Sequence, residues 1–387
     1  MIQIWLKKNI KGDPYIWTIL FMLSLCSIAV VYSATETLAY RRMEGNTEYF
    51  LVKHSILMIA AFFAMWFTHK LDYRYYLKLS RWALLASGPL LVLTYAFGRR
   101  INDASRWLTI PVINQAFQPS DLAKLALIAT IAGILSRRQS DIADIRKTLV
   151  PILCWSFGIC LLIALSNFST AGMLFMTCML LMFIGRVPTK YLVCLVLAGA
   201  LAGAIAFNYG QRGGTLKHRV MTFLSSDELP FQTEQSYIAI ASGGIFGKGP
   251  GNSNQKDILP HPDSDFVYAI IIEEYGMLGG CIVLMLYLAL LYRGLVAVSK
   301  SVNAFGGLLS AGLSFSLAVQ ALFNMGVAVG LVPVTGQPLP LLSMGGTSLI
   351  FTGMSFGIIL SVSRGETDAR LGQSSERRNA VRNRQAA

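Results

Sequence analysis

Carboxylic acids at the edge of an apolar run are the side chains in this sequence best suited to catalysis. Asp265 lies where a polar loop ends and the apolar run beginning at Phe266 starts. Partial loss of water at such a boundary tends to make a carboxylate a better base. We therefore interpret Asp265 as a candidate general base. The supporting acids would be Asp263, Glu273 and Glu274.

Two of these acids, Glu273 and Glu274, are adjacent inside the apolar run. Ionisable groups at such positions are costly, so they tend to mark function or to pair with other groups. Adjacent residues on a helix point about 100° apart, and both side chains cannot face one cavity equally. We expect one of them to be buried against polar groups of the proline-rich passage at 333–348, as a structural acid or as part of the site.

Cations and hydrogen-bonding side chains near these acids are candidates for binding a phosphorylated substrate. Arg106 beside Trp107 would either anchor the chain at a membrane interface or grip a sugar-phosphate headgroup. Lys124 lies one helical turn from Asp121, so it either pairs with that acid or faces the substrate. Lys53 would either snorkel to the headgroups or contact a lipid phosphate. The other candidate substrate-binding residues are Arg219, Lys248, Asn252, Ser253, Gln255, Lys256 and Ser343.

Three glycines of the same polar loop, Gly247, Gly249 and Gly251, alternate with other residues. Such a run can form a nest of backbone N–H groups that binds phosphate. The spacing fits no nucleotide-binding fingerprint, so it is weak evidence by itself.

Long apolar runs must hold these residues. Hydrophobic residues make up 54% of the chain and charged residues only 14%, which is typical of a polytopic membrane protein and excludes a soluble core as the main organisation. We predict an all-α integral membrane protein with about ten transmembrane helices. The expected spans are 15–34, 50–68, 80–97, 119–136, 148–166, 169–185, 190–208, 265–292, 307–330 and 347–363.

A large loop, about 209–264, separates the seventh and eighth spans and contains a helical patch near 235–241. The membrane domain, 15–363, is preceded by a basic lead, 1–14, and followed by a basic tail, 364–387, that we expect to be disordered.

Lysines and arginines are concentrated on one side of these spans. Most of the 33 fall in the terminal segments and the even-numbered loops, which predicts cytoplasmic termini and an exoplasmic large loop. The net charge of +13 is then mainly an orientation signal. A nucleic-acid binder is disfavoured because the basic residues are scattered among short loops without interleaved aromatic residues. The six cysteines lie in apolar runs without metal-binding spacing.

Three passages together resemble the SEDS family (shape, elongation, division and sporulation). They are NDASRWL…QPSDLAKL at 102–125, SGGIFGKGPGNSNQKDILP…SDF…EEYGMLGG at 242–280 and NMG…GLVPVTGQPLPLLSMGGTS at 324–348. The passages occur in the family's order, and the ten-span layout matches across nearly the whole chain.

The resemblance implies a peptidoglycan glycosyltransferase that polymerises lipid II at the outer face of the bacterial cytoplasmic membrane. In that family the aspartate of the Asp-Phe step entering the eighth span is catalytic, and here it is Asp265. The usual partner is a class B penicillin-binding protein, alongside other division proteins and membrane lipid. The short N-terminal segment and compact length favour the FtsW-like division branch, and so septal wall synthesis, over the RodA-like elongation branch. No cofactor is firmly implied, although Mg²⁺ or Mn²⁺ could neutralise the departing diphosphate.

The chain also departs from the family pattern. His261 stands where the family usually has the glutamate of Leu-Pro-Glu-x-His-Thr, which leaves Asp263 as the nearby carboxylate. Three further departures are Asp103, Asp121 and Met344. None of these changes removes Asp265.

The implied chemistry agrees with the residues. Joining two sugars needs a base for the acceptor hydroxyl and cations for the departing diphosphate. A single displacement with inversion is the simplest mechanism, because the sequence contains no second acid that must act as a nucleophile. Two other classes stay open. A flippase or secondary transporter also contains intramembrane acids and broken helices, and a membrane scaffold would only recruit division proteins.

Overall fold

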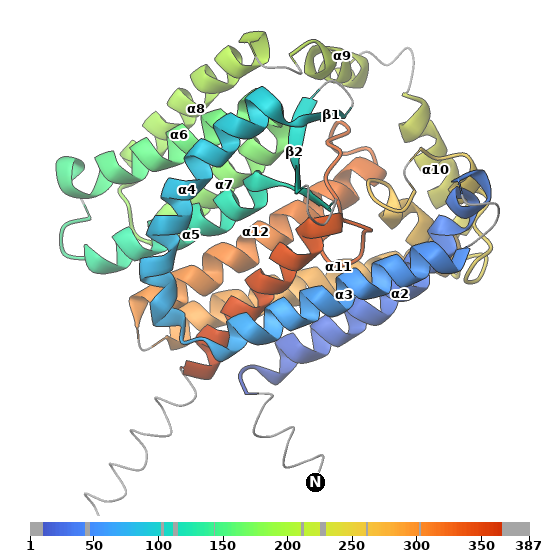
Figure 1. Ribbon diagram of the computed structural model, residues 1–387, viewed down its shortest axis with the longest axis horizontal. Coiled ribbons are helices and arrows are strands. Elements are labelled where there is room, and N and C mark those ends of the chain that lie inside the picture. The colour runs from blue at the N-terminus through green and yellow to red at the C-terminus, as the bar shows by residue number, and fades with distance from the viewer. Residues whose placement is uncertain are drawn as a thin grey trace, which may run out of the picture.

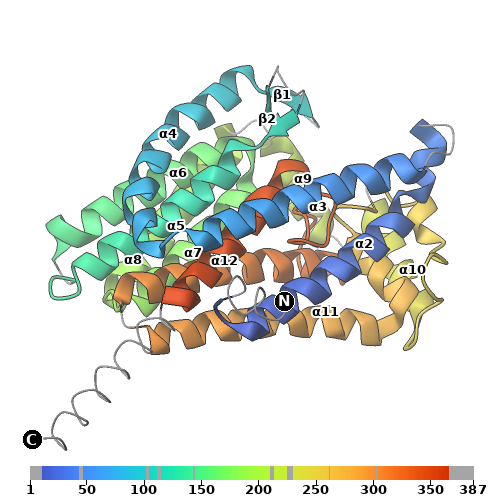
Figure 2. The same cartoon turned by 60° about the horizontal axis from the view of Figure 1, so that its bottom comes forward.

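The computed structural model describes residues 11–42, 47–101, 104–110, 115–142, 144–209, 213–224, 230–260, 262–301 and 303–365. Asp103, His261, most of the basic lead and nearly all of the basic tail lie outside these residues. The described chain forms a bundle of long helices that pack side by side (Figures 1 and 2).

Each predicted apolar span overlaps one of these helices. They are α2 (Pro14–Arg42), α3 (Thr47–Lys70), α4 (Tyr76–Phe97), α5 (Pro119–Arg137), α6 (Val150–Ser166), α7 (Phe168–Ile184), α8 (Thr189–Tyr209), α11 (Val267–Lys300), α12 (Ala304–Ala328) and an unlabelled last helix, Gly346–Gly365. Within the described residues, seven helices are long and apolar enough to cross a membrane, and α7 and part of α8 are shorter apolar helices. The predicted class, an all-α integral membrane protein, is confirmed.

Helix α12 is the most buried of the long apolar helices and packs against α5, α7 and α11. It carries Gln320 and Asn324 on its buried surface. A buried amide requires hydrogen-bond partners, so these two side chains must meet polar groups inside the bundle. Helix α12 thereby brings polar chemistry into the centre of an apolar domain.

A small antiparallel sheet connects α4 to α5 and was not predicted. Its strands are β1 (Arg99–Ile101), β2 (Ala104–Ile110) and β3 (Gln115–Phe117), in the order β1-β2-β3. Strand β2 pairs with β3 so that Leu108 lies opposite Phe117. The strands are short and interrupted, which is why the sequence pattern did not reveal them. The sheet holds the Arg106–Trp107 pair at one end of α5.

The remaining described elements lie between the long helices. They are the 3₁₀ turns η1 (Tyr73–Tyr75) and η3 (Gln255–Asp257), the π-helical turn η2 (Ile145–Leu149), and the helices α9 (Gly213–Leu224) and α10 (Phe231–Gly243). Helix α10 confirms the helical patch predicted near 235–241. Helices α9 and α10 both belong to the predicted large loop.

Helix α11 is broken at Gly276, where the sequence analysis expected one continuous span. Gly276 has φ 72° and ψ −177°, a conformation that strongly favours glycine. A turn at 243–249 satisfies the backbone groups freed by the break. The N–H groups of Lys248 and Gly249 donate to the carbonyls of Glu273 and Glu274, both at 2.9 Å.

The other side of the break is satisfied by the same turn. The N–H groups of Met277 and Leu278 donate to Gly244 O at 2.9 Å and to Ile245 O at 3.3 Å. A Cβ atom on Gly276 would lie 2.1 Å from Ile245 O, so the turn and the break fit only with glycine there. The suggested phosphate nest is therefore wrong at Gly249, whose N–H caps a helix.

The first and last described residues meet at one end of the bundle. Arg293 of α11 forms an ion pair with Asp13, and His69 Nε2 lies 2.8 Å from the carbonyl of Lys11. Arg364 donates to the carbonyl of Lys70 at 3.1 Å. This arrangement agrees with an even number of membrane crossings. That this end of the bundle lies on the cytoplasmic side of the membrane stays a prediction.

Candidate functional site

A cavity of about 190 Å³ opens between the sheet, α5, α12 and the chain leading into α11. Asp265 lines it, and so do Arg106, Trp107 and Lys124. The structure thus brings together four predicted site residues that are widely separated in sequence. The remaining residues lining the cavity are Gln118, Asp121, Asn167, Ser264, Gln320, Gly336, Gln337, Pro338, Met344, Gly345, Gly346 and Ser348.

Asp265 is half-buried and lies two residues before the first residue of α11. Ser264 Oγ donates to its Oδ1 at 3.1 Å, and Asn324 Nδ2 donates to its backbone carbonyl at 3.0 Å. These contacts fix the backbone and orient the carboxylate. The side chain can therefore face the cavity in a defined position.

Arg219 of α9 lies near this carboxylate. Its Nη1 donates to the carbonyl of Val334 at 2.8 Å, which ties α9 to the proline-rich passage. Burial lowers the pKa of the Arg219 guanidinium, and the negative charge of Asp265 opposes that shift by raising it. The two charges are thus close enough to interact. Arg219 does not line the cavity but adds positive potential beside it.

Lys124 and Asp121 form an ion pair at 2.8 Å, with exposed side-chain fractions of 18% and 4%. The predicted pairing is confirmed, and both residues line the cavity. The second carboxylate oxygen of Asp121, Oδ2, is buried without a hydrogen-bond partner. Arg106 Nε donates to the carbonyl of Ser166 at 3.3 Å, which orients its guanidinium at the cavity wall. The cavity therefore carries two cations and two carboxylates.

The proline-rich passage forms the floor of the cavity through amide hydrogen bonds. Gln337 Nε2 donates to Thr170 Oγ1 at 2.9 Å, and Gln320 Nε2 donates to Pro338 O at 2.9 Å. Asn324 Nδ2 also donates to Gln337 O at 2.8 Å. Irregular backbone at membrane depth requires such internal partners. The passage is thus a rigid support for the residues that line the cavity.

Ser343 stabilises the backbone next to Asp265. Its side chain is 1% exposed, accepts from Leu339 N at 2.8 Å and donates to Ser264 O at 2.7 Å. The hydroxyl is thus committed to the backbone next to Asp265, and a contact between Ser343 and substrate stays a prediction.

Several cavity residues were missed by the sequence analysis. Asn167 separates α6 from α7 and accepts from Thr170 N at 3.4 Å as an N-cap. Gln320 lies inside an apolar span, where a buried amide indicates a polar interior. That intramembrane signal was present in the sequence. Gln118, Gln337 and Ser348 carried no comparable signal.

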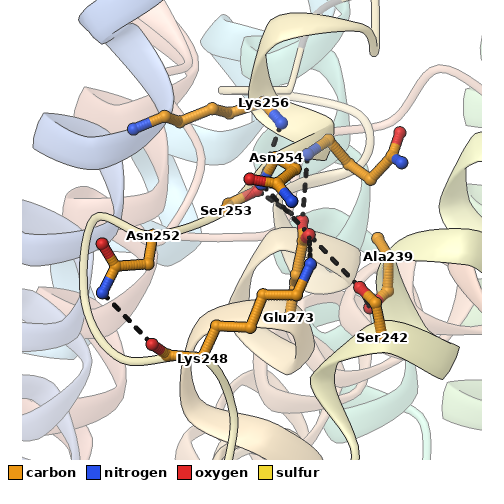
Figure 3. Close-up of polar contacts among 9 residues, drawn as sticks. Ala239, Ser242, Lys248, Asn252, Ser253, Asn254, Lys256 and Glu273 are labelled. Atoms are coloured by element: carbon orange, nitrogen blue, oxygen red, sulfur yellow. Dashed lines mark hydrogen bonds and ion pairs between the residues drawn. The ribbon is translucent and has the colours of Figure 1, made fainter.

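A second polar centre, the Glu273 cluster, shares no residue with the lining of this cavity. Figure 3 shows its hydrogen bonds and ion pair. The Glu273 side chain has no exposed area, and Lys248 Nζ donates to its Oε1 at 2.6 Å. Further donors are Ser242 Oγ at 3.2 Å, Ser253 Oγ, Asn254 N at 3.1 Å and Gln255 N at 3.2 Å. This carboxylate is thus saturated by donors from its own chain.

The Glu273 cluster corrects the predicted role of several loop residues. Lys248, Ser253 and Gln255 were assigned to substrate, but they bind Glu273 or lie buried beside it. Lys256 is buried, and its Nζ donates to the carbonyl of Gly251 at 2.8 Å. Asn252 donates to the carbonyl of Lys248 at 3.1 Å. None of these five residues lines the cavity, because they hold the loop together instead.

Glu274 and the other supporting acid also differ from expectation. Glu274 is 1% exposed and accepts a hydrogen bond from Ser33 of α2. Glu273 and Glu274 therefore face different neighbours, as predicted, but neither is hydrogen-bonded to 333–348, so that part of the prediction was wrong. Asp263 is half-buried, and its backbone carbonyl accepts from Met344 N at 2.9 Å. Lys53 is exposed on α3 and does not line the cavity.

The arrangement can perform acid-base chemistry on a phosphorylated substrate. A carboxylate and two cations line one hollow, which suits proton removal beside a departing anion. The described part of the chain contains no group of three or more histidine, cysteine or acidic side chains that could bind a metal ion.

Comparison with known proteins gives one consistent set of relatives. Residues 14–368 match the FTSW_RODA_SPOVE family, described as Cell cycle protein. Stage V sporulation protein E of Bacillus subtilis (strain 168) is 32% identical over 366 residues, which covers 92% of this chain and 98% of that protein. The probable peptidoglycan glycosyltransferase FtsW of Aliivibrio salmonicida (strain LFI1238) is 33% identical over 359 residues, 90% of this chain and 87% of that protein.

Solved structures agree. A chain from the structure described as "Structural coordination of polymerization and crosslinking by a peptidoglycan synthase complex" is similar with a TM-score of 0.71 and 26% identity, covering 92% of this chain and 98% of that one. The crystal structure of the rod shape determining protein RodA of Thermus thermophilus has a TM-score of 0.66 and 26% identity, covering 92% and 97%.

Proposed function

The chain belongs to the FtsW/RodA/SpoVE family of cell cycle proteins, and from this premise we propose that it is a peptidoglycan glycosyltransferase that polymerises lipid II for septal wall synthesis. One structural observation carries the proposal. Asp265 shares a cavity with Arg106 and Lys124, so a base and two cations surround the same space. Relatives named peptidoglycan glycosyltransferase FtsW support the same activity.

In the proposed mechanism Asp265 removes the proton from the acceptor sugar hydroxyl. The freed oxygen attacks the anomeric carbon of the donor sugar, a new glycosidic bond forms, and the bond to the lipid diphosphate breaks with its electron pair leaving on the phosphate oxygen. Lys124 and Arg106 stabilise that departing charge by charge-assisted hydrogen bonds. One displacement inverts the anomeric carbon, because Asp265 acts as base and not as nucleophile.

The size of the cavity sets what it can hold. Drug-sized ligands occupy pockets of about 300–1,000 Å³, whereas this cavity measures about 190 Å³. It therefore suits the reacting hydroxyl and phosphate, with the rest of the glycan, the peptide and the lipid tail outside. Trp107 at the rim offers an apolar face to a sugar ring.

A divalent cation, Mg²⁺ or Mn²⁺, would neutralise charge on the diphosphate as it leaves. Mg²⁺ commonly binds through one or two carboxylates together with substrate phosphates, and besides the base Asp265 the cavity offers the Lys124-paired Asp121. We propose that the substrate diphosphate brings the cation. Turnover in EDTA, compared with turnover restored by Mg²⁺ or Mn²⁺, measures the requirement.

The proposal includes a place and partners. The reaction would occur at the outer face of the bacterial cytoplasmic membrane, with both termini cytoplasmic, as the distribution of lysine and arginine predicts. A class B penicillin-binding protein would crosslink the strands, a pairing supported by the similar chain in a peptidoglycan synthase complex. Other division proteins would direct the pair to the septum.

A direct assay tests the function. The full chain is purified, reconstituted in vesicles with lipid II, and supplied with a class B penicillin-binding protein whose transpeptidase serine is inactivated. Glycan strands resolved by gel electrophoresis are the expected product. Movement of lipid II across the vesicle membrane without strand formation would instead identify the flippase, and loss of both activities would leave only the scaffold.

A further inference from the structure

A second cavity, which we call the apolar slot, lies between α6, α7 and α8 and has a volume of about 80 Å³. Its lining consists of phenylalanine, leucine, alanine, glycine and cysteine residues, without a charged or amide side chain. A cavity lined in this way stays dry, because water finds no hydrogen-bond partner in it. The three helices coincide with predicted membrane spans, so the ligand that suits the slot is a hydrocarbon chain.

Glycines give the slot its shape. Gly199 and Gly203 let α8 approach the rings of α7, since a Cβ atom on Gly199 would lie 2.7 Å from the Phe175 ring and one on Gly203 would lie 3.5 Å from the Phe168 ring. Gly172 lies between these two phenylalanines in sequence, and a Cβ atom there would point into open space. Gly172 is also exposed. The slot is therefore closed along α8 and open to the surroundings at Gly172.

The slot adjoins the reaction cavity where α6 ends and α7 begins. Asn167 lines the reaction cavity, and the next residue, Phe168, lines the slot. On the α6 side Ala164 lines the slot, and two residues later the carbonyl of Ser166 accepts the hydrogen bond from Arg106 Nε at 3.3 Å. Two residues of a helix span only about 3 Å along its axis. The slot thus begins beside the arginine that the proposed mechanism assigns to the departing diphosphate.

The direction of the slot matches the way a lipid tail would leave that position. From Phe168 to Phe175 the slot follows α7 for about 10 Å, at a rise of about 1.5 Å per residue, away from the junction at Asn167. In a polyprenyl diphosphate the tail is bonded directly to the phosphate. Its first isoprene units must therefore lie next to the groups that hold the diphosphate.

We propose that the apolar slot binds the first isoprene units of the donor substrate, the one whose diphosphate departs. The inference rests on the proposed function and adds to it the path of the donor tail. Lipid chains are as apolar as the slot, so transfer of the tail from the bilayer contributes little affinity. The benefit is orientation, because a tail held between two phenylalanine rings and α8 fixes the position of its diphosphate relative to Arg106 and Asp265.

Photolabelling tests this path in the full chain. The Asp265→Asn chain, which is expected to hold the substrate unreacted, is reconstituted in vesicles of phosphatidylethanolamine and phosphatidylglycerol. One sample contains a lipid II analogue with a diazirine in its first isoprene units, and another contains a phosphatidylglycerol with a diazirine in its acyl chain. Labelled peptides are identified by mass spectrometry after irradiation.

Two glycine substitutions in the same background provide a matched pair. Gly172→Leu places a side chain at the open mouth of the slot. Gly158→Leu on α6 is the control, because a Cβ atom there also points into open space but Gly158 does not line the slot. Monodispersity in detergent checks that both variants fold.

We expect the lipid II probe to label residues 157–164, 168–175 and 199–203 several-fold more than the exposed face of α11 around Met285, which is 62% exposed. Gly172→Leu should remove this excess, and Gly158→Leu should retain it. The phosphatidylglycerol probe should label both regions alike.

Two results would overturn the inference. Labelling by the lipid II probe without an excess at the slot would mean that the tail mixes with bulk lipid. An equal excess with the phosphatidylglycerol probe would make the slot a site for any acyl chain. Strand formation by the wild-type chain is measured separately, so strands made by a chain whose slot stays unlabelled refute the slot alone. A labelled slot in a chain that makes no strands refutes only the proposed activity.

Discussion

Asp265 and Glu273 lie about two helical turns apart on one short segment, yet their surroundings differ completely. Asp265 is half-buried and faces a cavity of about 190 Å³. Glu273 has no exposed side-chain area and accepts from five groups of its own chain. The Asp265 carboxylate lines an open cavity, whereas the Glu273 carboxylate is enclosed by hydrogen-bond donors.

The difference teaches how to tell a working acid from a structural one. A general base needs a place for the proton donor within hydrogen-bond reach, which a cavity provides. A carboxylate saturated by internal donors has its charge balanced and its lone pairs used, so it stabilises the loop instead. The comparison favours Asp265 for the proposed chemistry and Glu273 for assembly of the 248–255 loop.

The largest expected effect comes from Asp265→Asn. The amide keeps the size of the side chain but cannot take a proton, and loss of a general base costs about 10²–10⁴-fold in rate. Polymerisation of lipid II by the purified variant measures it. Asp257→Asn, at an exposed aspartate of the same loop, should retain wild-type turnover. If Asp265→Asn polymerises lipid II at the wild-type rate, Asp265 is not the general base and is only a structural polar residue before α11.

The next effect is expected for Lys124→Met. Losing a charge-assisted hydrogen bond to the departing diphosphate costs about 1.5–3 kcal/mol, or about 10- to 150-fold in turnover. Turnover per folded molecule is measured, because the variant also leaves Asp121 buried without its cation. Lys147→Met, at an exposed lysine paired with Asp144, is the control. Normal turnover in Lys124→Met would reduce the Lys124–Asp121 pair to a structural contact.

Glu273→Gln tests whether the second carboxylate has a structural role. The amide still accepts hydrogen bonds but leaves Lys248 without a counter-charge, and hydrogen bonds to charged groups contribute about 1.5–3 kcal/mol each. We expect a lower melting temperature and folded yield, with normal turnover per folded molecule. Glu234→Gln on the exposed face of α10 should change neither. A variant with normal yield and lost turnover would place Glu273 in the chemistry.

The smallest expected effect belongs to Ser343→Ala. Its hydroxyl bonds the backbone of Ser264 and Leu339, and such neutral hydrogen bonds contribute about 0.5–1.5 kcal/mol each. Turnover should fall by about tenfold at most and stability slightly, because only the bond to Ser264 O acts next to Asp265, and Asp265 keeps its bond from Asn324. Ser299→Ala at an exposed serine is the control. An effect as large as that of Asp265→Asn would support direct contact between Ser343 and substrate.

The sequence was informative about residues whose surroundings change abruptly. Asp265 stands at a boundary between polar and apolar segments, and Arg106 with Trp107 precedes a clear helix start at Pro119. These positions lie in the cavity. The resemblance named Asp265 independently. Helical spacing alone offered the Lys124–Asp121 pair as one of two alternatives for Lys124, and the structure contains this pair.

Loop residues were harder to place from their types. The sequence of a glycine-rich loop is the same whether its lysine or serine contacts a phosphate or a buried carboxylate, so residue type alone does not distinguish the two. Lys248 and Ser253 face Glu273 because the chain folds back onto α11 at Gly276. Similarly, the side-chain amides of Gln320 and Asn324 reach the carbonyls of Pro338 and Gln337 only after α12 and the proline-rich passage pack together.

The sequence by itself determined the class, the apolar helices and the residue at the membrane boundary, because these depend on local hydrophobicity and on contrasts between neighbouring residues. Only the tertiary structure decided which polar groups share a cavity and which neutralise one another. Asp265 and Glu273 are the same kind of group in the same segment, and their roles diverge because a carboxylate's behaviour depends on the donors and the space around it. Both are supplied by distant parts of the chain.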